Sequence, residues 1–195
     1  MILAFDTSGP FVSAILAVGP KRHIRHIDMA KGQAESLMRI LTDMVAEARG
    51  SWRDLVALGV CVGPGNFTGI RIAMGGANGL GQALSIPVVS ISSLEITVWG
   101  HDRPCLGLVP GPRTRVYSQV FDPGPKAPVF GEVTDVPSDL TVCHWSAKTP
   151  EQRLQALIAL TQERYRTTPL GPAKPLYVKP PDAAPSRDHA VRVLS

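Results

Sequence analysis

The stretch that most constrains the fold of this 195-residue chain runs from Gly59 to Glu95. Residues 59–62 form a short apolar run that favours a strand. The loop from Gly63 to Gly69 holds three glycines and a proline, which no helix or strand would accommodate. A helical pattern follows over Ile70 to Leu84, and Val88 to Ile91 is expected to form the next strand. This order requires a parallel pair of strands, so the sequence predicts an α/β fold.

The glycine loop resembles phosphate-binding loops in general terms, because backbone N–H groups and a helix N-terminus attract anions. Its spacing, Gly63-x-Gly65-x-x-x-Gly69, is one residue too long for a dinucleotide fingerprint, and no Lys-Ser/Thr follows a glycine at Walker spacing. Two interpretations stay open. Either the loop holds an anion, or its glycines let the strand and the helix approach each other closely.

Several small residues lie inside the predicted helix, and each glycine there costs up to about 1 kcal/mol relative to alanine. They recur at a spacing of four, as Ala73, Ala77 and Gly81 and as Gly75 and Gly79. The helix therefore has faces with almost no side chain, on which another helix can sit at a short axial distance. That second helix belongs either to the same chain or to a partner subunit.

Composition and cysteine usage limit the class of protein. Hydrophobic residues make up 44% of the chain and charged residues 18%, as in soluble globular proteins, and no apolar run approaches membrane-spanning length. The N-terminus enters a strand at Ile2 without a leader pattern, so we expect a cytoplasmic protein. Cys61, Cys105 and Cys143 are too few and too scattered for a disulfide framework or a thiolate metal site. The net charge of +4 indicates a mild preference for polyanionic partners such as RNA.

The chain is expected to open with three strands, at residues 2–5, 12–18 and 21–28. Asp6, Thr7 and Ser8 follow the first strand, and their oxygens would either meet a metal-bound nucleotide phosphate or hydrogen-bond the backbone of their own turn. In the third strand, His23 and His26 are three residues apart and point to opposite faces, which favours plain surface histidines over metal ligands.

A helix is predicted over residues 33–48 and is stopped by Gly50. Its apolar stripe is wider than the usual width of about 100°, so one side can cover a sheet while the other meets a second helix. The stripe consists of Ala34, Leu37, Met38, Leu41, Val45 and Ala48, widened by Ile40 and Met44. With the central unit, the order becomes β-β-β-α-β-α-β, which indicates a mixed sheet.

A polar stretch at residues 100–104 marks a boundary, which divides the chain into a first subdomain, 1–102, and a second, 103–195. The second half partly repeats the first, which suggests a duplicated architecture with a reduced second copy. It has strands at 106–109, 115–121, 129–133, 141–145 and 176–178, a helix from Thr149 to about Arg166, and a loosely ordered tail at 179–195.

Five segments, in order along nearly the whole chain, form a recognisable set. They are I-L-A-F-D-T-S at 2–8, Q-A-E-S-L at 33–37, V-G-P-G-N-F-T-G-I-R-I at 62–72, I-P-V-V-S-I-S-S-L-E at 86–95 and P-L-Y-V-K-P at 175–180. This set resembles the bacterial TsaB (YeaZ) family. The resemblance implies an actin-like ATPase fold, related to ribonuclease H, with two subdomains of which the second is reduced.

The resemblance also implies a function. The chain would be the non-catalytic partner and activator of the TsaD transferase, which makes threonylcarbamoyladenosine at position 37, next to the anticodon, in tRNAs that read codons beginning with A. The ATPase TsaE would join the complex, tRNA and ATP or ADP would bind only through it, and the chain alone would be a homodimer. The metal-binding H-x-x-x-H pair of the catalytic paralogue is missing, so no catalytic residue, metal ligand or cofactor is expected in this chain.

Site residues follow from matching positions. A vestigial nucleotide or phosphate site would use Asp6, Thr7, Ser8, Gly63, Gly65, Thr68 and Gly69; Pro64, Phe67 and Arg71 match the same motif. The family's dimer face is built from the first two helices. It predicts a partner interface of Leu37, Met38, Leu41, Met44, Ala73, Gly76, Ala77, Leu80 and Gly81. Ala77→Phe is then expected to block partner binding without unfolding the chain.

The sequence departs from the family pattern at Gln33, where His is frequent, at Asn66, where Ser is frequent, and at 109–113. Two other function classes stay open. One is an enzyme in its own right, a nucleotide-binding transferase or a glycopeptidase-like enzyme, although no general base or G-x-S-x-G motif stands out. The other is an RNA-binding module that uses Arg22, Arg25, Lys174, Lys179, Arg187 and Arg192.

Overall fold

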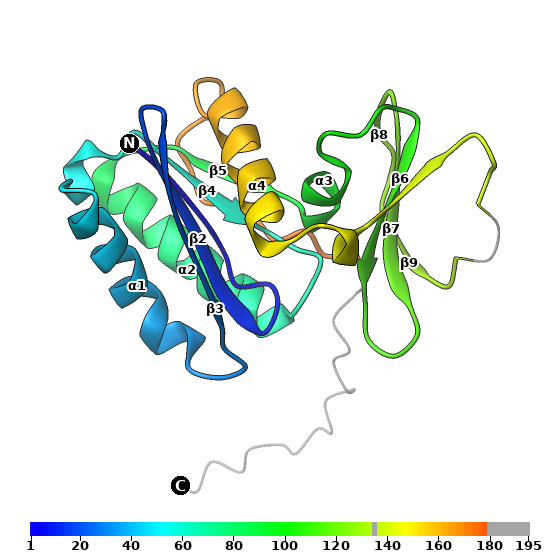
Figure 1. Ribbon diagram of the computed structural model, residues 1–195, viewed down its shortest axis with the longest axis horizontal. Helices are drawn as coiled ribbons and strands as arrows, with labels where there is room; N and C mark the ends of the chain where they lie inside the picture. The colour runs from blue at the N-terminus through cyan, green and yellow to red at the C-terminus, as the bar shows by residue number, and fades with distance from the viewer. Residues whose placement is uncertain (134–135, 179–195) are drawn as a thin grey trace, which may run out of the picture.

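The computed structural model describes residues 1–133 and 136–178, which form two β-sheets flanked by helices (Figure 1). The first sheet has the strand order β3-β2-β1-β4-β5, and only the pairs β1·β4 and β4·β5 are parallel among its neighbours. Its strands are β1 (Ile2–Asp6), β2 (Phe11–Val18), β3 (Lys21–Asp28), β4 (Ala57–Cys61) and β5 (Val88–Ile91). The predicted mixed sheet is confirmed.

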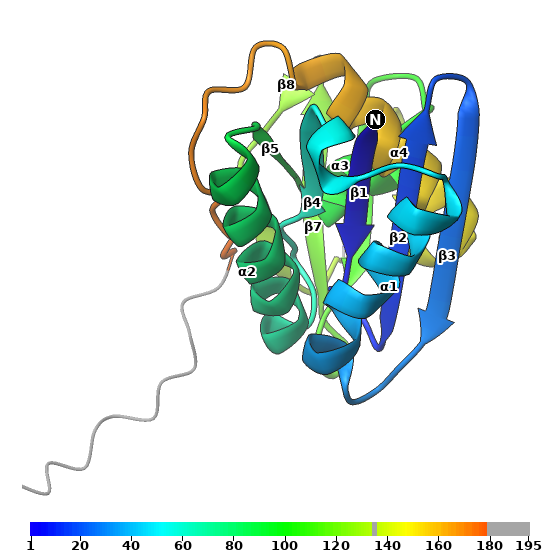
Figure 2. The same ribbon diagram turned by 90° about the vertical axis from the view of Figure 1, so that its left-hand side faces the viewer.

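Alternation along β1 sends side chains to two separate cores. Leu3 and Phe5 pack with the helices α1 (Gln33–Glu47) and α2 (Phe67–Leu84), whereas Ile2 and Ala4 pack with α4 (Pro150–Arg164). Figure 2 shows α1 and α2 side by side across one face of the sheet, with α4 behind it. Both faces are therefore covered, which explains why β4 is apolar throughout and β1 is apolar up to its last residue, Asp6, instead of alternating with polar residues.

The ends of the helices follow from local capping. Thr149 and Gln152 form a reciprocal capping box at the start of α4, with Pro150 at the first position, as the sequence predicts. Helix α2 begins at Phe67, three residues before the predicted start at Ile70. The reason is Asn66, whose side-chain Oδ1 accepts a hydrogen bond of 2.8 Å from the backbone N–H of Gly69.

The second sheet has the order β10-β6-β7-β8, and β9 also pairs with β7. Its strands are β6 (Cys105–Pro110), β7 (Val116–Asp122), β8 (Gly124–Pro125), β9 (Val129–Gly131) and β10 (Thr141–His144). The short strand β8 was not predicted. Single turns of 3-10 helix occupy Trp52–Asp54 and Trp145–Ala147. Helix α3 (Ser93–Val98) covers one face through Leu94 and Val98, which pack against Phe121.

Two helices pack across the predicted boundary near residue 102. Helix α3 precedes the boundary but lies on the second sheet, and α4 follows it but lies on the first sheet (Figure 1). In the part of the chain that the structure describes, the second half therefore keeps no crossover helix of its own that matches those of the first half. The two sheets are tied together by this exchange.

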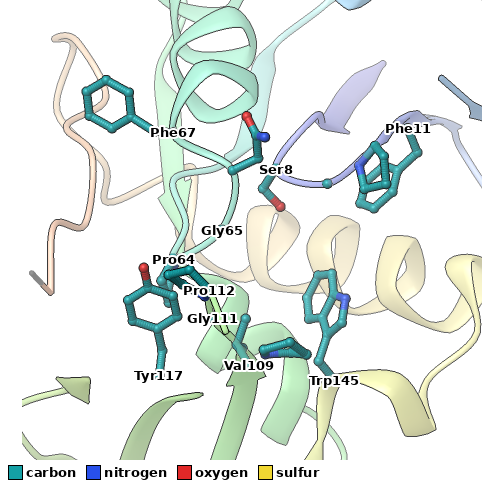
Figure 3. A pocket seen from close by; sticks show the side chains of 14 residues that line it. Ser8, Phe11, Pro64, Gly65, Phe67, Val109, Gly111, Pro112, Tyr117 and Trp145 are labelled. Atoms are coloured by element: carbon teal, nitrogen blue, oxygen red, sulfur yellow. The ribbon is translucent and has the colours of Figure 1, made fainter. Parts of the chain in front are cut away.

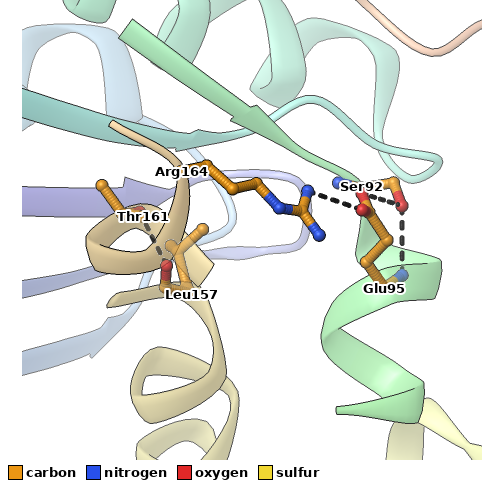
Figure 4. Close-up of polar contacts among 5 residues, drawn as sticks. All are labelled: Ser92, Glu95, Leu157, Thr161 and Arg164. Carbon is orange, nitrogen blue, oxygen red and sulfur yellow. Dashed lines mark hydrogen bonds and ion pairs between the residues drawn. The ribbon is translucent and has the colours of Figure 1, made fainter. Parts of the chain in front are cut away.

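A polar clamp joins the exchanged helices (Figure 4). Glu95 Oε2 accepts hydrogen bonds from the backbone N–H and the hydroxyl of Ser92, which caps α3, and Glu95 Oε1 accepts from Arg164 Nη1 of α4 at 2.7 Å. The Glu95 side chain is 24% exposed and the Arg164 side chain 37%, so solvent screens the ion pair only in part. The clamp fixes how α3 and α4 lie against each other.

After α4 the chain runs back along α2 as an extended segment, residues 171–178, which we call the C-terminal strap. Asn78 on α2 holds it with two hydrogen bonds, one to the carbonyl of Ala173 and one from its N–H, at 3.3 and 2.7 Å. The N–H of Leu176 donates to the carbonyl of Val62 at 3.0 Å. The strand predicted at 176–178 is wrong, because these residues pack as a strap and join neither sheet. The predicted tail, 179–195, lies outside the described residues.

Candidate functional site

A cleft of about 520 Å³ opens between the two sheets (Figure 3). The turn between β1 and β2, the loop before α2 and the turn between β6 and β7 form it. Tyr117 of β7 and Trp145 complete the wall. Its lining residues are Ser8, Gly9, Pro10, Phe11, Pro64, Gly65, Asn66, Phe67, Val109, Pro110, Gly111, Pro112, Tyr117 and Trp145.

All fourteen lining residues are uncharged, and four of them are prolines. Phe11, Phe67, Tyr117 and Trp145 contribute aromatic rings, while the side chains of Ser8 and Asn66 contribute polar groups. Such a lining favours a ligand with flat apolar surfaces and a few hydrogen-bonding groups.

Gln33 fixes the turn that forms one wall of the cleft. Its side-chain Nε2 donates to the backbone carbonyls of Gly9 and Phe11, each at 2.7 Å, and the residue is buried at the start of α1. Gln33 is one of the positions at which the sequence departs from the family pattern. In this chain it positions Phe11, and the sequence alone did not indicate that role.

The residues predicted to bind phosphate do meet, but they bind one another. The hydroxyl of Thr7 donates to the carbonyl of Gly69 at 2.6 Å, and the N–H of Asn66 donates to the carbonyl of Ser8 at 2.7 Å. A Cβ atom at Gly65 would lie 2.6 Å from the carbonyl oxygen of Ser8. The glycines therefore allow the turn after β1 to approach the start of α2. Ser8 and Gly65 also line the cleft, and Thr68 is exposed on α2.

Asp6 is buried behind this junction and is absent from the cleft lining. Its Oδ1 accepts a hydrogen bond of 2.7 Å from the N–H of Ser8. Burial raises the pKa of the Asp6 carboxyl, and the hydrogen bonds from Ser8 and the nearby charge of Arg153 oppose that shift. Of the two interpretations of Asp6, the structure supports hydrogen bonding within its own turn.

These contacts decide how well a metal-bound nucleotide fits. The N–H groups of Ser8, Asn66 and Gly69 already donate within the chain, and the cleft walls offer no charge to neutralise a polyphosphate. The residues present therefore do not fit that group. Within residues 1–133 and 136–178, three or more His, Cys, Asp or Glu side chains nowhere gather as a metal site.

The predicted partner interface needs a correction. Six of its nine residues are buried inside the chain, between the helices and the first sheet: Leu37, Leu41, Met44, Ala73, Ala77 and Gly81. A Cβ atom at Gly81 would lie 2.4 Å from Cγ2 of Val88 in β5. The small residues at 73, 77 and 81 thus pack within the same chain. Ala77→Phe would disrupt this core, so the expectation of a folded variant is wrong.

The opposite side of α2 is open. Cβ atoms built at Gly75 and Gly79 would meet no atom within 4 Å, and Met38 on α1 is 40% exposed. Gly76 and Leu80 are partly exposed between them. We call this surface, made of Met38, Gly75, Gly76, Gly79 and Leu80, the α1–α2 face. Three residues of the predicted interface belong to it, and their binding role remains a prediction.

The other predicted residues make ordinary contacts. Arg25 pairs with Glu47 at 2.6 Å, and Arg22 donates to the carbonyl of Gly19 at 2.8 Å. His26 is not a plain surface histidine, since its Nδ1 lies 2.6 Å from the hydroxyl of Ser13. Lys174 is exposed on the C-terminal strap, whereas Lys179, Arg187 and Arg192 lie outside the described residues.

An exposed aromatic pair joins α2 to the C-terminal strap. The rings of Phe67 and Tyr177 stack with centroids 5.7 Å apart, and Arg71 lies over Phe67 at 4.0 Å. Phe67 is also a lining residue of the cleft, so the strap ends beside the cleft.

The sequence analysis missed Phe11, Tyr117 and Trp145 as cleft residues. They come from three turns or strands far apart in the chain, and no local pattern links them.

Comparison with known proteins identifies the family to which this chain belongs. Residues 28–166 match the model of a protein family described as TsaD: tRNA N6-adenosine threonylcarbamoyltransferase. This chain belongs to that family. Within it, the chain is 33% identical to the Haemophilus influenzae protein named tRNA threonylcarbamoyladenosine biosynthesis protein TsaB, over 48% of this chain and 39% of the relative. The TsaB (YeaZ) resemblance is confirmed.

Two further matches cover most of the chain. An uncharacterized protein of Mycobacterium tuberculosis is 29% identical over 94% of both chains. YeaZ from Pseudomonas aeruginosa shares the fold, with a TM-score of 0.70 and 21% identity over 90% of this chain and 98% of that chain. The predicted fold class, a two-sheet actin-like α/β fold, is confirmed. In the described residues, every helix is too short or too polar to cross a membrane.

Proposed function

We propose that this chain is a TsaB-type subunit that binds and activates a TsaD-type transferase in the biosynthesis of threonylcarbamoyladenosine in tRNA. Relatives named TsaB carry that pathway in their names, and the matching family model is described by the transferase itself. The matched residues, 28–166, include both α1 and α2. The proposal assigns the chain a place in the pathway as a partner.

The observation that carries the proposal is the open α1–α2 face. Gly75 and Gly79 lie one helical turn apart with free space where side chains would be, and the apolar side chains of Met38 and Leu80 flank them. A helix can approach such a surface more closely than one covered by side chains, which increases the contact between the two backbones. The five glycines of α2 reduce the intrinsic stability of this helix, and a packed partner would offset that cost.

The cleft supports a partner role better than a catalytic one. Its fourteen lining residues are uncharged, so none of them offers a charged group to stabilise the charge that develops in a transition state. Asp6 is buried away from the cleft. ATP or ADP would then bind only in the assembled complex.

We assign the TsaD-type subunit to the α1–α2 face. When the TsaD-type subunit is absent, a second copy of this chain would bind the same face. A TsaE-type ATPase would join the complex, tRNA would bind through it, and all would act in the cytoplasm.

Reconstituted modification of tRNA tests this proposal. Unmodified tRNA, threonine, bicarbonate and ATP would be incubated with the TsaD-type and TsaE-type proteins and the enzyme that activates threonine, all from the same organism. Mass spectrometry of the nucleosides would measure threonylcarbamoyladenosine. We expect product only when this chain is present, and none with Gly79→Phe. Gly131→Phe is the matched control, since Gly131 in β9 also has open space. Full product without this chain would contradict the proposal.

A further inference from the structure

The cleft and the end of the described chain lie next to each other. Tyr177 stacks on Phe67, which lines the cleft, and the described chain ends one residue later at Val178. The sequence continues with Lys179-Pro180-Pro181-Asp182. The strap that delivers this continuation is held by Asn78, by the carbonyl of Val62 and by Arg71, whose Nε donates to the Tyr177 hydroxyl at 3.4 Å.

From this arrangement we propose that the segment Lys179–Asp182 of the same chain binds in the cleft, with its two prolines against the aromatic wall. Proline-containing segments in the polyproline II conformation bind grooves lined by aromatic rings, because the conformation is preformed and presents flat apolar rings. The walls at Phe11, Tyr117 and Trp145 offer surfaces of that kind. This inference does not depend on the proposed tRNA pathway.

The hydrogen-bonding groups of the cleft match such a segment. Proline has no N–H, so a proline pair presents carbonyl acceptors and needs donors opposite them. Within residues 1–133 and 136–178, the indole N–H of Trp145, the hydroxyl of Tyr117 and the side-chain amide N–H₂ of Asn66 donate to no protein acceptor; the amide oxygen of Asn66 caps α2. These three donors line the cleft and are free to bind the carbonyls of the segment.

Tethering makes weak binding sufficient. A segment joined to the wall of its own binding site has an effective concentration of about millimolar, so it can occupy that site even with a weak intrinsic affinity. The uncharged prolines also fit a cleft without charged walls better than a nucleotide phosphate does. The cleft would therefore be filled by the chain itself.

Paramagnetic NMR on the full chain tests this inference. A nitroxide would be attached to Ser186→Cys; the three native cysteines are buried and should not react. We expect the indole N–H signal of Trp145 to lose intensity. That of Trp52, which precedes β4 at the end of the sheet opposite the cleft, should keep its intensity as the internal control. Adding Pro180→Ser and Pro181→Ser to the labelled chain should restore the Trp145 signal.

The other outcomes would overturn the inference. Unchanged intensity at Trp145, or an equal loss at Trp52, would show that the segment does not occupy the cleft. Loss of methyl signals at Met38 and Leu80 in place of Trp145 would locate the segment on the α1–α2 face. A loss seen only when nitroxide-labelled chain is mixed with separately isotope-labelled chain would assign the occupant to a second copy.

Discussion

The hydroxyl of Thr7 donates a hydrogen bond of 2.6 Å to the carbonyl of Gly69, and a Cβ atom at Gly69 would lie 1.8 Å from the carbonyl oxygen of Thr7. The turn after β1 and the first turn of α2 are thus in direct backbone contact. Both residues belong to motifs that suggest a ligand site. In this chain they form a structural joint between the first strand and the second helix.

Gly69→Ala should be strongly destabilising. The added methyl meets backbone, which cannot rotate away, so the joint must open or shift, and overpacking of this kind costs about 1–3 kcal/mol. Urea denaturation followed by circular dichroism measures the free energy of unfolding. Gly75→Ala is the matched control, because it lies in the same helix with open space and should stabilise the chain by up to about 1 kcal/mol. Equal effects of the two variants would contradict the assigned contact.

Asp6 should make stability depend on pH. Its pKa in the unfolded chain is the ordinary 3.8, and burial raises it in the folded chain. The folded state therefore binds the proton more tightly, so this contribution to stability is complete below pH 3.8 and is lost as the pH rises through the folded pKa. Asp6→Asn, which keeps an oxygen for the N–H of Ser8, should lack this loss.

The measurement is the free energy of unfolding of both proteins from pH 3.8 upward. The difference, wild type minus Asp6→Asn, should decrease as the pH rises. The exposed Asp139→Asn serves as the control for removal of a carboxylate. A difference that increases with pH would show that attraction to Arg153 outweighs the burial of Asp6.

Asn78 should control the C-terminal strap. Its amide accepts from the N–H of Ala173 and donates to the carbonyl of the same residue, so Asn78→Ala leaves both backbone groups without this partner. The cost should be about 1–3 kcal/mol of local stability. Amide hydrogen exchange should become faster at Ala173 in this variant and stay unchanged in β1. Gln82→Ala, at an exposed position of the same helix, is the control. Unchanged exchange at Ala173 would mean that the remaining contacts hold the strap without Asn78.

Magnesium–ATP should not bind the isolated chain. The N–H groups of Asn66 and Gly69 at the start of α2 donate within the chain, and the lining residues of the cleft are uncharged. Calorimetry with millimolar ligand should therefore give no heat beyond dilution. A saturable signal that is lost when Tyr117→Ala removes part of the aromatic wall of the cleft, but kept in Gly131→Val, would instead support a nucleotide-dependent activity of the chain alone.

Features set by neighbouring residues could be predicted from the sequence. The start of α4 at Thr149 and Pro150 and the mixed strand directions of the first sheet depend on local signals and on the connections between consecutive elements. Contacts between distant segments could not be predicted. The small residues of α2 were correctly expected to pack closely, but helical periodicity does not show that Ala77 faces the chain's own sheet while Gly79 faces outward.

The strap shows the same limit. The apolar run at 176–178 has the composition of a strand, yet the N–H of Leu176 bonds to the loop carbonyl of Val62. Whether an extended segment joins a sheet depends on a free strand edge, which composition does not reveal. The cleft is likewise a product of the fold, since Phe11 and Trp145 meet only when the two sheets are in place.

Binding to the TsaD-type partner is the most direct test of the account. Size-exclusion chromatography with light scattering would be run on this chain, on the TsaD-type protein of the same organism and on their mixture at micromolar concentration. We predict a peak at the mass of a heterodimer, which Gly79→Phe removes and Gly131→Phe keeps, while both variants unfold like the wild type. Separate peaks for the wild-type mixture, or a heterodimer that tolerates Gly79→Phe, would contradict the assignment of the α1–α2 face as the partner interface.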